Sequence, residues 1–276
     1  MTKCNTKYPI VLIHGVGFRD RKYLNYWGRI PAALDKQGAT IFYGCQDSWG
    51  NIGYNAEVLK NNINKILKDT NSEKVNVIAH SKGGIEARYM ISTLGMADKI
   101  ASLTTIATIH NGSKTIDLLL RLPNWLFRLA AFFTNLFFRI LGDKKPDFHT
   151  SCKQFSTAYM KEFNNNNPDD PSVYYQSFAA VMQNPFSDLV MFWTYLFVWL
   201  IEGENDGLVT PEAAKWTNFG NILRGATRRG ISHADEVDLR RMNFTKKPRI
   251  MEYLISGSSI WMWSLDLSKW DYKILQ

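Results

Sequence analysis

Cysteine is scarce in this sequence, and the spacing of the cysteines argues against folds that depend on disulfides or on structural zinc. Among the 276 residues there are three cysteines, Cys4, Cys45 and Cys152, which are far apart along the chain. An odd number of cysteines without a metal-binding spacing argues against a disulfide framework and against a structural zinc site. We therefore expect reduced thiols, and the count leaves open one disulfide plus one free thiol.

The sequence also lacks an uninterrupted hydrophobic run of membrane-spanning length. The stretch from Leu118 to Gly142 is nearly long enough, but Arg121, Arg128 and Arg139 interrupt it. An arginine near the centre of a transmembrane helix is costly, because its charge would lie in hydrocarbon. We therefore predict no transmembrane segment in this chain.

A signal peptide is not visible at the start of the sequence. The first apolar run, Ile10 to Ile13, is short and leads directly into His14 and Gly15. A signal peptide needs an apolar stretch of about 7–15 residues. We expect a cytoplasmic protein, or one secreted without an N-terminal signal, or one whose leader has already been removed.

Acidic residues are fewer than basic ones, which gives a formal net charge of +8. Such an excess is compatible with an anionic partner such as a nucleic acid, a membrane or an acidic substrate. The basic residues are scattered, however, and no helix-turn-helix, zinc-finger or RNP-like pattern accompanies them. We therefore predict no nucleic-acid partner and interpret the excess as a solvated basic face.

Strand and helix patterns alternate through the first 110 residues. This alternation predicts right-handed crossovers and a mostly parallel central sheet with helices on both faces, which is an α/β fold. The length fits one domain over residues 1–276. The predicted strands cover residues 8–15, 39–45, 75–80 and 102–109, and the predicted helices cover residues 24–37, 55–69 and 85–94.

After residue 109 this rhythm stops, and two strongly apolar runs follow, at residues 118–142 and 188–201. Both are more apolar than a helix that covers one sheet face needs to be. We predict a helical cap inserted at approximately residues 113–202, apolar toward a pocket or toward lipid. Buried core helices are the alternative. The segment VYYQSFAAV, from Val173, is predicted to return to the sheet within this region.

The stretch VNVIAHSKGG places Ser81 between a predicted buried strand and a predicted helix. Small-x-Ser-x-Gly at such a junction is typical of a nucleophile elbow, a strained turn that exposes the serine at the carboxyl ends of the strands. Ala79 and Gly83 supply the small residues that the turn requires. We predict Ser81 as a nucleophile and the backbone N–H of Lys82 as an oxyanion donor. The Lys82 side chain is left without a role.

A serine hydroxyl is a poor nucleophile without a base, so position must select one histidine from five. His80 adjoins the serine, and its side chain should point elsewhere. His14 fits an oxyanion loop, and His110 ends a strand where it could line the pocket. His149 falls in the predicted cap without an acidic motif beside it. His233, in a loop late in the chain, is the predicted base.

Asp206 is the predicted acid of the triad. It lies in an Asn-Asp-Gly sequence, which on its own is most often just a turn. However, Ser81, Asp206 and His233 follow the chain order of the α/β-hydrolase triad. His233 would take the serine proton, and Asp206 would hold the imidazole in the correct tautomer and stabilise the imidazolium.

Four segments together resemble the bacterial true lipases of the α/β-hydrolase fold, of the Pseudomonas, Burkholderia and Proteus type, and their clostridial relatives. The segments are KYPIVLIHGVG, AHSKGG, ENDGLV and SHADEVD, and the resemblance extends over residues 7–117 and 202–243. It implies an α/β-hydrolase fold, no organic cofactor, and the backbone N–H of Val16 as the second oxyanion donor. It also implies a lid that opens at a lipid interface, a role that residues 118–142 would suit.

The same resemblance implies a structural calcium ion beside the catalytic histidine. Asp235 matches a calcium ligand in that family, while Leu239 and Asn243 stand where main-chain carbonyls bind the ion. Asp188 is the nearest candidate for the second aspartate. Calcium prefers oxygen ligands of this kind. The alternative is that Asp235 is a charge at a helix N-terminus and that Asp188 is a helix N-cap.

The leading hypothesis is therefore a serine-dependent lipase that hydrolyses acylglycerol esters through an acyl-enzyme. A short-chain carboxylesterase or a polyester hydrolase would use the same triad, and transfer of the acyl group to an acceptor other than water would share the same intermediate. A non-catalytic lipid-binding module is an alternative of a different class. The expected partners are a lipid or ester substrate and a lipid interface that the lid contacts transiently.

Overall fold

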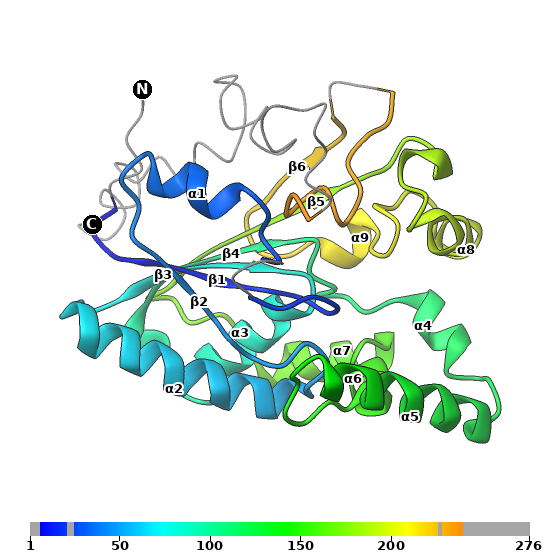
Figure 1. Cartoon of the computed structure of the whole chain (residues 1–276), viewed down its shortest axis with the longest axis horizontal. Coiled ribbons are helices and arrows are strands. Elements are labelled where there is room, and N and C mark those ends of the chain that lie inside the picture. The colour runs from blue at the N-terminus through cyan, green and yellow to red at the C-terminus, as the bar shows by residue number, and fades with distance from the viewer. Residues whose placement is uncertain (1–5, 21–24, 226–227, 240–276) are drawn as a thin grey trace.

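The computed structural model describes residues 6–20, 25–225 and 228–239. A six-stranded sheet runs through its centre in the order β2-β1-β3-β4-β5-β6, with helices above and below it (Figure 1). Every neighbouring pair of these strands is parallel, which confirms the predicted α/β class. The strands are β1 (Ile10–Ile13), β2 (Ile41–Tyr43), β3 (Val75–His80), β4 (Ile100–Ile106), β5 (Tyr174–Ala180) and β6 (Phe219–Leu223).

The predicted helices of the first half are present with shifted ends. The helix predicted from residue 24 begins only at Ile30, where Pro31 occupies the first turn, a position at which proline loses no intrahelical hydrogen bond. Asn51 caps the second helix by accepting a hydrogen bond from the Tyr54 N–H at 3.0 Å, so that helix begins earlier than predicted. The α-helices are α1 (Ile30–Asp35), α2 (Ile52–Thr70), α3 (Lys82–Ser92), α4 (Lys114–Leu119), α5 (Asn124–Ile140), α6 (Phe148–Gln154), α7 (Thr157–Asn166), α8 (Phe192–Glu202) and α9 (Pro211–Ala214).

Strand β1 shows why helices cover both faces of the sheet. Successive side chains of a strand point to opposite faces, and all four residues of β1 are buried. Ile10 and Leu12 belong to one core cluster with residues of α1. Val11 and Ile13 belong to another cluster with residues of α2 and α3. Each face therefore needs its own layer of helices, as in other parallel sheets.

The region predicted as a cap contains helices of two kinds. Helices α4 to α7 lie between β4 and β5, and α8 lies between β5 and β6. Helix α7 packs against α3, where Phe163 stacks on Tyr89, and so it covers the core. Helices α4 and α8 contact each other beyond the carboxyl ends of the strands, and α5 contacts α6 (Figure 1). Strand β5 returns to the sheet as predicted.

Among the described residues, no helix combines the length and the hydropathy that crossing a bilayer requires. Helix α5 has 17 residues. Its arginines lower the mean hydropathy of the run in which it lies, as the sequence led us to expect.

Both described cysteines are free thiols. Cys45 is exposed and Cys152 is buried. Cys4 lies outside the described residues, so the prediction of reduced thiols is confirmed for two of the three positions.

We expect Leu59→Ala to lower the free energy of unfolding by about 2–5 kcal/mol, because it leaves a cavity between α2 and the sheet. The Leu59 side chain is fully buried in the α2 cluster. Lys65→Ala, at an exposed position of the same helix, is the control and should change stability by less than about 0.5 kcal/mol. Urea unfolding of both variants measures the difference. Equal losses would contradict the packing described here.

Candidate active site

Ser81 lies on a strained turn between β3 and α3. Its backbone has φ 54° and ψ −131°, a conformation that residues with side chains rarely adopt. The Ser81 N–H donates to the Ile106 carbonyl at 2.9 Å, and the Ser81 carbonyl accepts from the Gly84 N–H at 3.1 Å. These bonds hold the serine at the carboxyl end of β3, which is the geometry predicted for a nucleophile elbow.

The turn is possible only because neighbouring segments approach it very closely. A Cβ atom at Gly83 would lie 2.5 Å from the His14 carbonyl oxygen, and one at Gly15 would lie 2.6 Å from the Ser81 Cβ atom. Neither residue has positive φ, so space and not backbone conformation selects glycine at these positions. The loop after β1 thus presses directly against the elbow.

Asp206 and His233 form a buried pair. The Oδ2 atom of Asp206 lies 2.7 Å from Nδ1 of His233, and the His233 N–H donates to the Asp206 carbonyl at 2.8 Å. The other carboxylate oxygen accepts from the backbone N–H groups of Leu208 and Val209, at 2.9 and 2.8 Å. Gly207, with φ 112°, allows the tight turn that brings these donors round. The Asn-Asp-Gly segment is therefore a turn that also positions a carboxylate.

The third member of the predicted set lies beside this pair. The ring of His233 lies 4.4 Å, between ring centroids, from the ring of His80, the residue that precedes Ser81. Nε2 of His233 has no hydrogen-bond partner within the described residues, Ser81 included. Catalytic hydrogen bonds are often long in a protein without substrate and tighten when substrate binds. The fold thus brings the Asp206–His233 pair against the residue that precedes Ser81, and it leaves Nε2 of His233 without a partner among the described residues.

Sequence reasoning missed a second buried acid, Glu236. Its Oε2 atom lies 2.7 Å from Nε2 of His80 and 3.8 Å from Nδ1 of His233. Nδ1 of His80 in turn lies 2.6 Å from the Tyr26 hydroxyl. Glu236 follows His233 by three residues, and this one-turn spacing is the only sequence signal that could have suggested it. No sequence signal identifies Tyr26, which comes from a distant segment.

Burial determines which protonation states of His80 and Glu236 are favoured. Burial, and then the negative charge of Asp206, raise the pKa of Glu236 well above its ordinary value. Burial, and then the nearby His233, lower the pKa of His80 well below its ordinary value. A neutral Glu236 and a neutral His80 are thus both favoured, and one proton shared between them satisfies the pair.

A cavity of about 380 Å³ extends from the elbow to the inserted helices. Ser81, Val16 and Lys82 all lie in its wall, so the two residues predicted to supply oxyanion donors line the same cavity as Ser81. The rest of the wall is almost entirely apolar and draws on α4, α5, α6 and α8. It includes Trp49, Ile109, Ile116, Leu119, Leu120, Phe127, Phe148, Cys152, Phe155, Phe197, Val198, Leu208 and Val209.

Two side chains near the elbow have roles that the sequence did not indicate. Lys82 is buried and forms an ion pair with Glu86, one helical turn further along α3. Asn55 donates a 2.7 Å hydrogen bond to the same carboxylate.

The expectation that His110 lines the pocket is wrong: His110 is fully buried, bonds to Thr105 and Arg88, and takes no part in the cavity wall.

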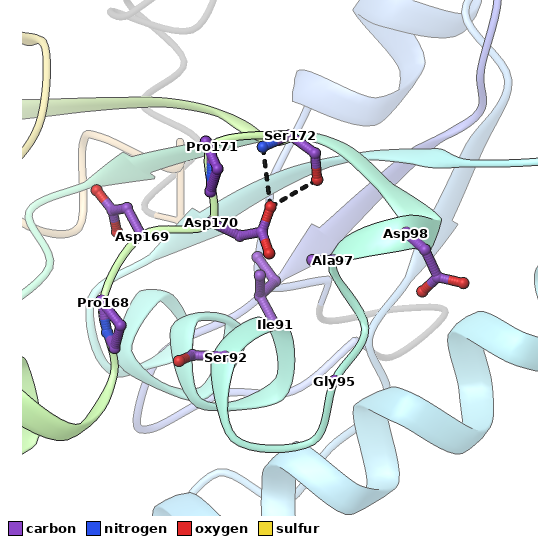
Figure 2. Close-up of a pocket in the computed structure, with 10 residues that line it drawn as sticks. All are labelled: Ile91, Ser92, Gly95, Ala97, Asp98, Pro168, Asp169, Asp170, Pro171 and Ser172. Atoms are coloured by element: carbon purple, nitrogen blue, oxygen red, sulfur yellow. Dashed lines mark hydrogen bonds between the residues drawn. The ribbon is translucent and has the colours of Figure 1, made fainter.

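A second hollow of about 570 Å³ lies at the amino ends of β4 and β5, away from Ser81. It is formed by the end of α3 and by the segments that precede β4 and β5 (Figure 2). The carboxylate of Asp170 lies in it and accepts hydrogen bonds from the backbone N–H and the hydroxyl of Ser172, at 2.8 and 2.6 Å. None of its lining residues belongs to the predicted site. Although this hollow is larger than the cavity at Ser81, we do not consider it a candidate active site.

The predicted calcium ligands lie next to the His233 turn. Asp188 and Asp235 are both buried, and the Ser232 hydroxyl donates to Asp188 at 2.7 Å while it accepts from the Asp235 N–H at 3.2 Å. Two buried carboxyl groups around one hydroxyl offer the oxygen chemistry that calcium uses. Leu239 is half-buried at the end of the same turn. Asn243 lies outside the described residues.

One further group in the described part of the chain has metal-binding residue types close together, namely His80, His233 and Glu236. In this group His80 bonds directly to Glu236, and His233 bonds through Nδ1 to Asp206. These bonds make the group part of a hydrogen-bond network around the two imidazoles.

Comparison with known proteins places this geometry in context. Residues 8–214 match the family described as the alpha/beta hydrolase fold. Triacylglycerol lipase 2 of Saccharomyces cerevisiae is 31% identical over 223 residues, which are 74% of this chain and 63% of that protein. A triacylglycerol lipase of Vibrio cholerae is 36% identical over 114 residues, 41% of this chain and 36% of that protein. The matched part thus spans less than two thirds of either relative.

Solved structures share the fold at lower sequence identity. The mature form of Bacillus licheniformis lipase BlEst2 aligns with a TM-score of 0.64 and 21% identity, over 87% of this chain and 89% of that one. The Staphylococcus hyicus lipase aligns with a TM-score of 0.64 and 18% identity, over 97% of each chain. These likenesses confirm the predicted fold.

We expect Glu236→Gln to remove a pH dependence that the native protein shows. A carboxyl group with a raised pKa in the folded state stabilises the fold fully below its unfolded pKa, near 4.5, and this contribution is lost as pH rises through the folded pKa. The unfolding free energy of the native protein should therefore fall relative to the variant as pH rises above about 4.5, by at most about 1.4 kcal/mol per pH unit. Urea unfolding from acid to alkaline pH measures this, and parallel curves would contradict it.

Proposed function

The chain belongs to the α/β-hydrolase fold family, and we propose that it is a serine-dependent carboxylic-ester hydrolase that acts on acylglycerols. The observation that carries the proposal is the buried Asp206–His233 pair, next to an elbow serine that opens on an apolar cavity. Similarity to triacylglycerol lipases supports the choice of substrate class.

In the proposed mechanism, the Ser81 hydroxyl attacks the ester carbonyl while Nε2 of His233 takes its proton. Asp206 holds the imidazole through Nδ1 and stabilises the imidazolium that forms. The backbone N–H groups of Val16 and Lys82 stabilise the oxyanion of the tetrahedral intermediate. The alcohol leaves with the proton from His233, and water activated by His233 then releases the fatty acid from the acyl-enzyme.

The cavity supports long acyl chains as substrates. Its wall beyond Ser81 is apolar, so burial of an acyl chain would be favourable by about 0.8 kcal/mol for each methylene. Helices α5 and α8 contribute Phe127, Phe197 and Val198 to this wall. In our proposal these two helices form the lid, which contacts the lipid interface when substrate enters.

We also propose that Asp188 and Asp235 hold a calcium ion, with the main-chain carbonyls of Leu239 and Asn243. The bound ion would brace the turn that carries His233, because Asp235 lies two residues after His233. The ion would have a structural role, and the chemical steps belong to the triad. No organic cofactor enters this mechanism.

Ser81→Ala is expected to reduce ester hydrolysis by at least about 10³-fold, since the variant cannot form the acyl-enzyme. Hydrolysis of p-nitrophenyl esters is measured over short to long acyl chains, and hydrolysis of emulsified triacylglycerol is measured beside it. The control is Ser92→Ala, on the same helix at the far hollow, which should retain native activity. Full activity of Ser81→Ala would refute the mechanism. Activity on short chains only, even with emulsified lipid, would identify a short-chain esterase instead.

Removal of calcium is expected to lower the thermal midpoint of unfolding, because an ion that binds only the folded state stabilises it. Differential scanning fluorimetry is run with and without EDTA, and calcium should restore the midpoint. Asp188→Asn should have a lowered midpoint that no longer responds to EDTA. Asp170→Asn, at the far hollow, is the control and should respond like the native protein. A native midpoint that EDTA leaves unchanged would refute the calcium site.

A further inference from the structure

Helices α5 and α8 expose apolar side chains to an unusual extent. In α5 only Ala131 is buried. Trp125 is 69% exposed and Ile140 is 76% exposed, and in and before α8 the exposed fractions reach 77% at Trp193 and 82% at Val190. We call the exposed apolar residues of 122–140 and 186–200 the α5–α8 surface.

The two helices belong to one site. Phe127 of α5 and Phe197 of α8 both line the cavity that begins at Ser81, so the two helices that carry the α5–α8 surface also form part of the wall of that cavity. Monomeric soluble proteins rarely expose apolar surface on this scale unless something binds to it. Tryptophan at such positions is typical of side chains that sit at a membrane–water interface.

The charges beside this surface have one sign. Between residues 114 and 145 every exposed charged side chain is basic: Lys114, Arg121, Arg128, Arg139, Lys144 and Lys145. The acidic residues of that segment are turned inward, since Asp117 accepts hydrogen bonds from Thr157 and Asp143 is buried. Basic residues that flank an apolar helix are attracted to anionic lipid headgroups.

The carboxylates in α8 and just before it are also turned inward. Asp188, before the helix, is buried, and Glu202 accepts hydrogen bonds from the Ser113 hydroxyl at 2.6 Å and from the Thr115 N–H at 2.8 Å. Glu204, just after the helix, is exposed and forms an ion pair with Arg224. Neither Asp188 nor Glu202 presents an exposed negative charge to a bilayer. Both halves of the surface are therefore compatible with an anionic partner.

The C-terminal end of helix α5 is fixed to the body of the protein. Asp143 accepts from the N–H groups of Ser48 and Trp49, at 3.0 and 2.9 Å. In return Asp47 accepts from the N–H groups of Lys144 and Lys145, at 2.8 and 2.6 Å. This reciprocal pair of buried carboxylates joins the loop before α2 to the end of α5.

A second copy of the chain fits this surface less well. In a symmetric dimer the same patch meets itself, so the arginines of α5 would face arginines of the other copy. Like charges brought together in this way oppose association, whereas anionic headgroups would neutralise them. We propose that the α5–α8 surface binds an anionic lipid bilayer peripherally, with the outer end of the Ser81 cavity facing the lipid.

The inference rests on the proposed function only in that the membrane would hold the substrate, and binding itself does not need the nucleophile. The test therefore uses Ser81→Ala, which consumes no lipid. Flotation with vesicles is compared between phosphatidylcholine alone and phosphatidylcholine mixed with phosphatidylglycerol. We expect binding to the mixed vesicles that weakens as salt is raised, and little binding to the neutral ones.

Two sets of changes separate the contributions of charge and apolar contact. Arg128→Glu with Arg139→Glu should lower partition onto the mixed vesicles by about tenfold or more, because each basic residue near an anionic surface contributes roughly fivefold. Lys65→Glu with Lys68→Glu, at exposed positions of α2, is the matched control and should lower it less. Trp125→Ser with Trp193→Ser should also weaken binding, at all salt concentrations.

Other outcomes overturn the proposal. Equal partition onto both vesicle types, or no effect of the arginine changes, would refute recognition of an anionic surface. The protein could instead form a stable dimer that does not bind vesicles. If Trp125→Ser with Trp193→Ser dissociated that dimer, the surface would be assigned to a second copy of the chain. Vesicle binding by a protein whose native form hydrolyses no ester would leave this inference standing while the proposed function fails.

Discussion

The strained backbone of Ser81 is the constraint on which the rest of the site depends. A residue with a side chain in this conformation costs about 1–3 kcal/mol, and it persists only where the surroundings leave no alternative. Parallel pairing of β3 with β4, and the start of α3 directly after the serine, impose it. The loop after β1 must then pass so close that Gly15 has no room for a side chain. The position of Ser81 and the close approach of the loop after β1 thus follow from one turn.

The buried polar groups behind the elbow divide into two chains of hydrogen bonds that meet at two adjacent imidazoles, whose planes are inclined by 45°. In one chain, Asp206 is held by backbone donors and holds His233. In the other, Glu236 and Tyr26 hold His80 from both sides. Among the side-chain atoms of these five residues, Nε2 of His233 and Oε1 of Glu236 are the ones without a partner in the described part of the chain. The remaining hydrogen bonds fix the orientation of both rings, because a buried donor or acceptor that loses its partner is expensive.

Local patterns were enough to predict the parallel sheet, the elbow at Ser81 and the pairing of Asp206 with His233. Strand periodicity indicated the sheet, and the residues around Ser81 indicated the elbow. The order of Ser, Asp and His along the chain indicated the pair. The partners of His80 were not predictable, because Tyr26 and Glu236 lie 54 and 156 residues from it. The direction of the Lys82 side chain was not predictable either, since it depends on Glu86 and on Asn55 from another helix. The prediction that His110 lines the pocket was wrong for the same reason. A position at the end of a strand shows at which end of the sheet a residue lies, but it does not show the direction of the side chain.

The hydrogen bonds that Asp47 and Asp143 accept have a mechanical consequence for α5. Because they fix residues 143–145, just after the last residue of α5, a rotation of α5 would take place about its C-terminal end. The helix has 17 residues, so it is a rigid lever about 25 Å long. In such a rotation the displacement of a side chain grows with its distance from the C-terminal end of the helix. Trp125 and its neighbours, at the N-terminal end, would therefore move farthest.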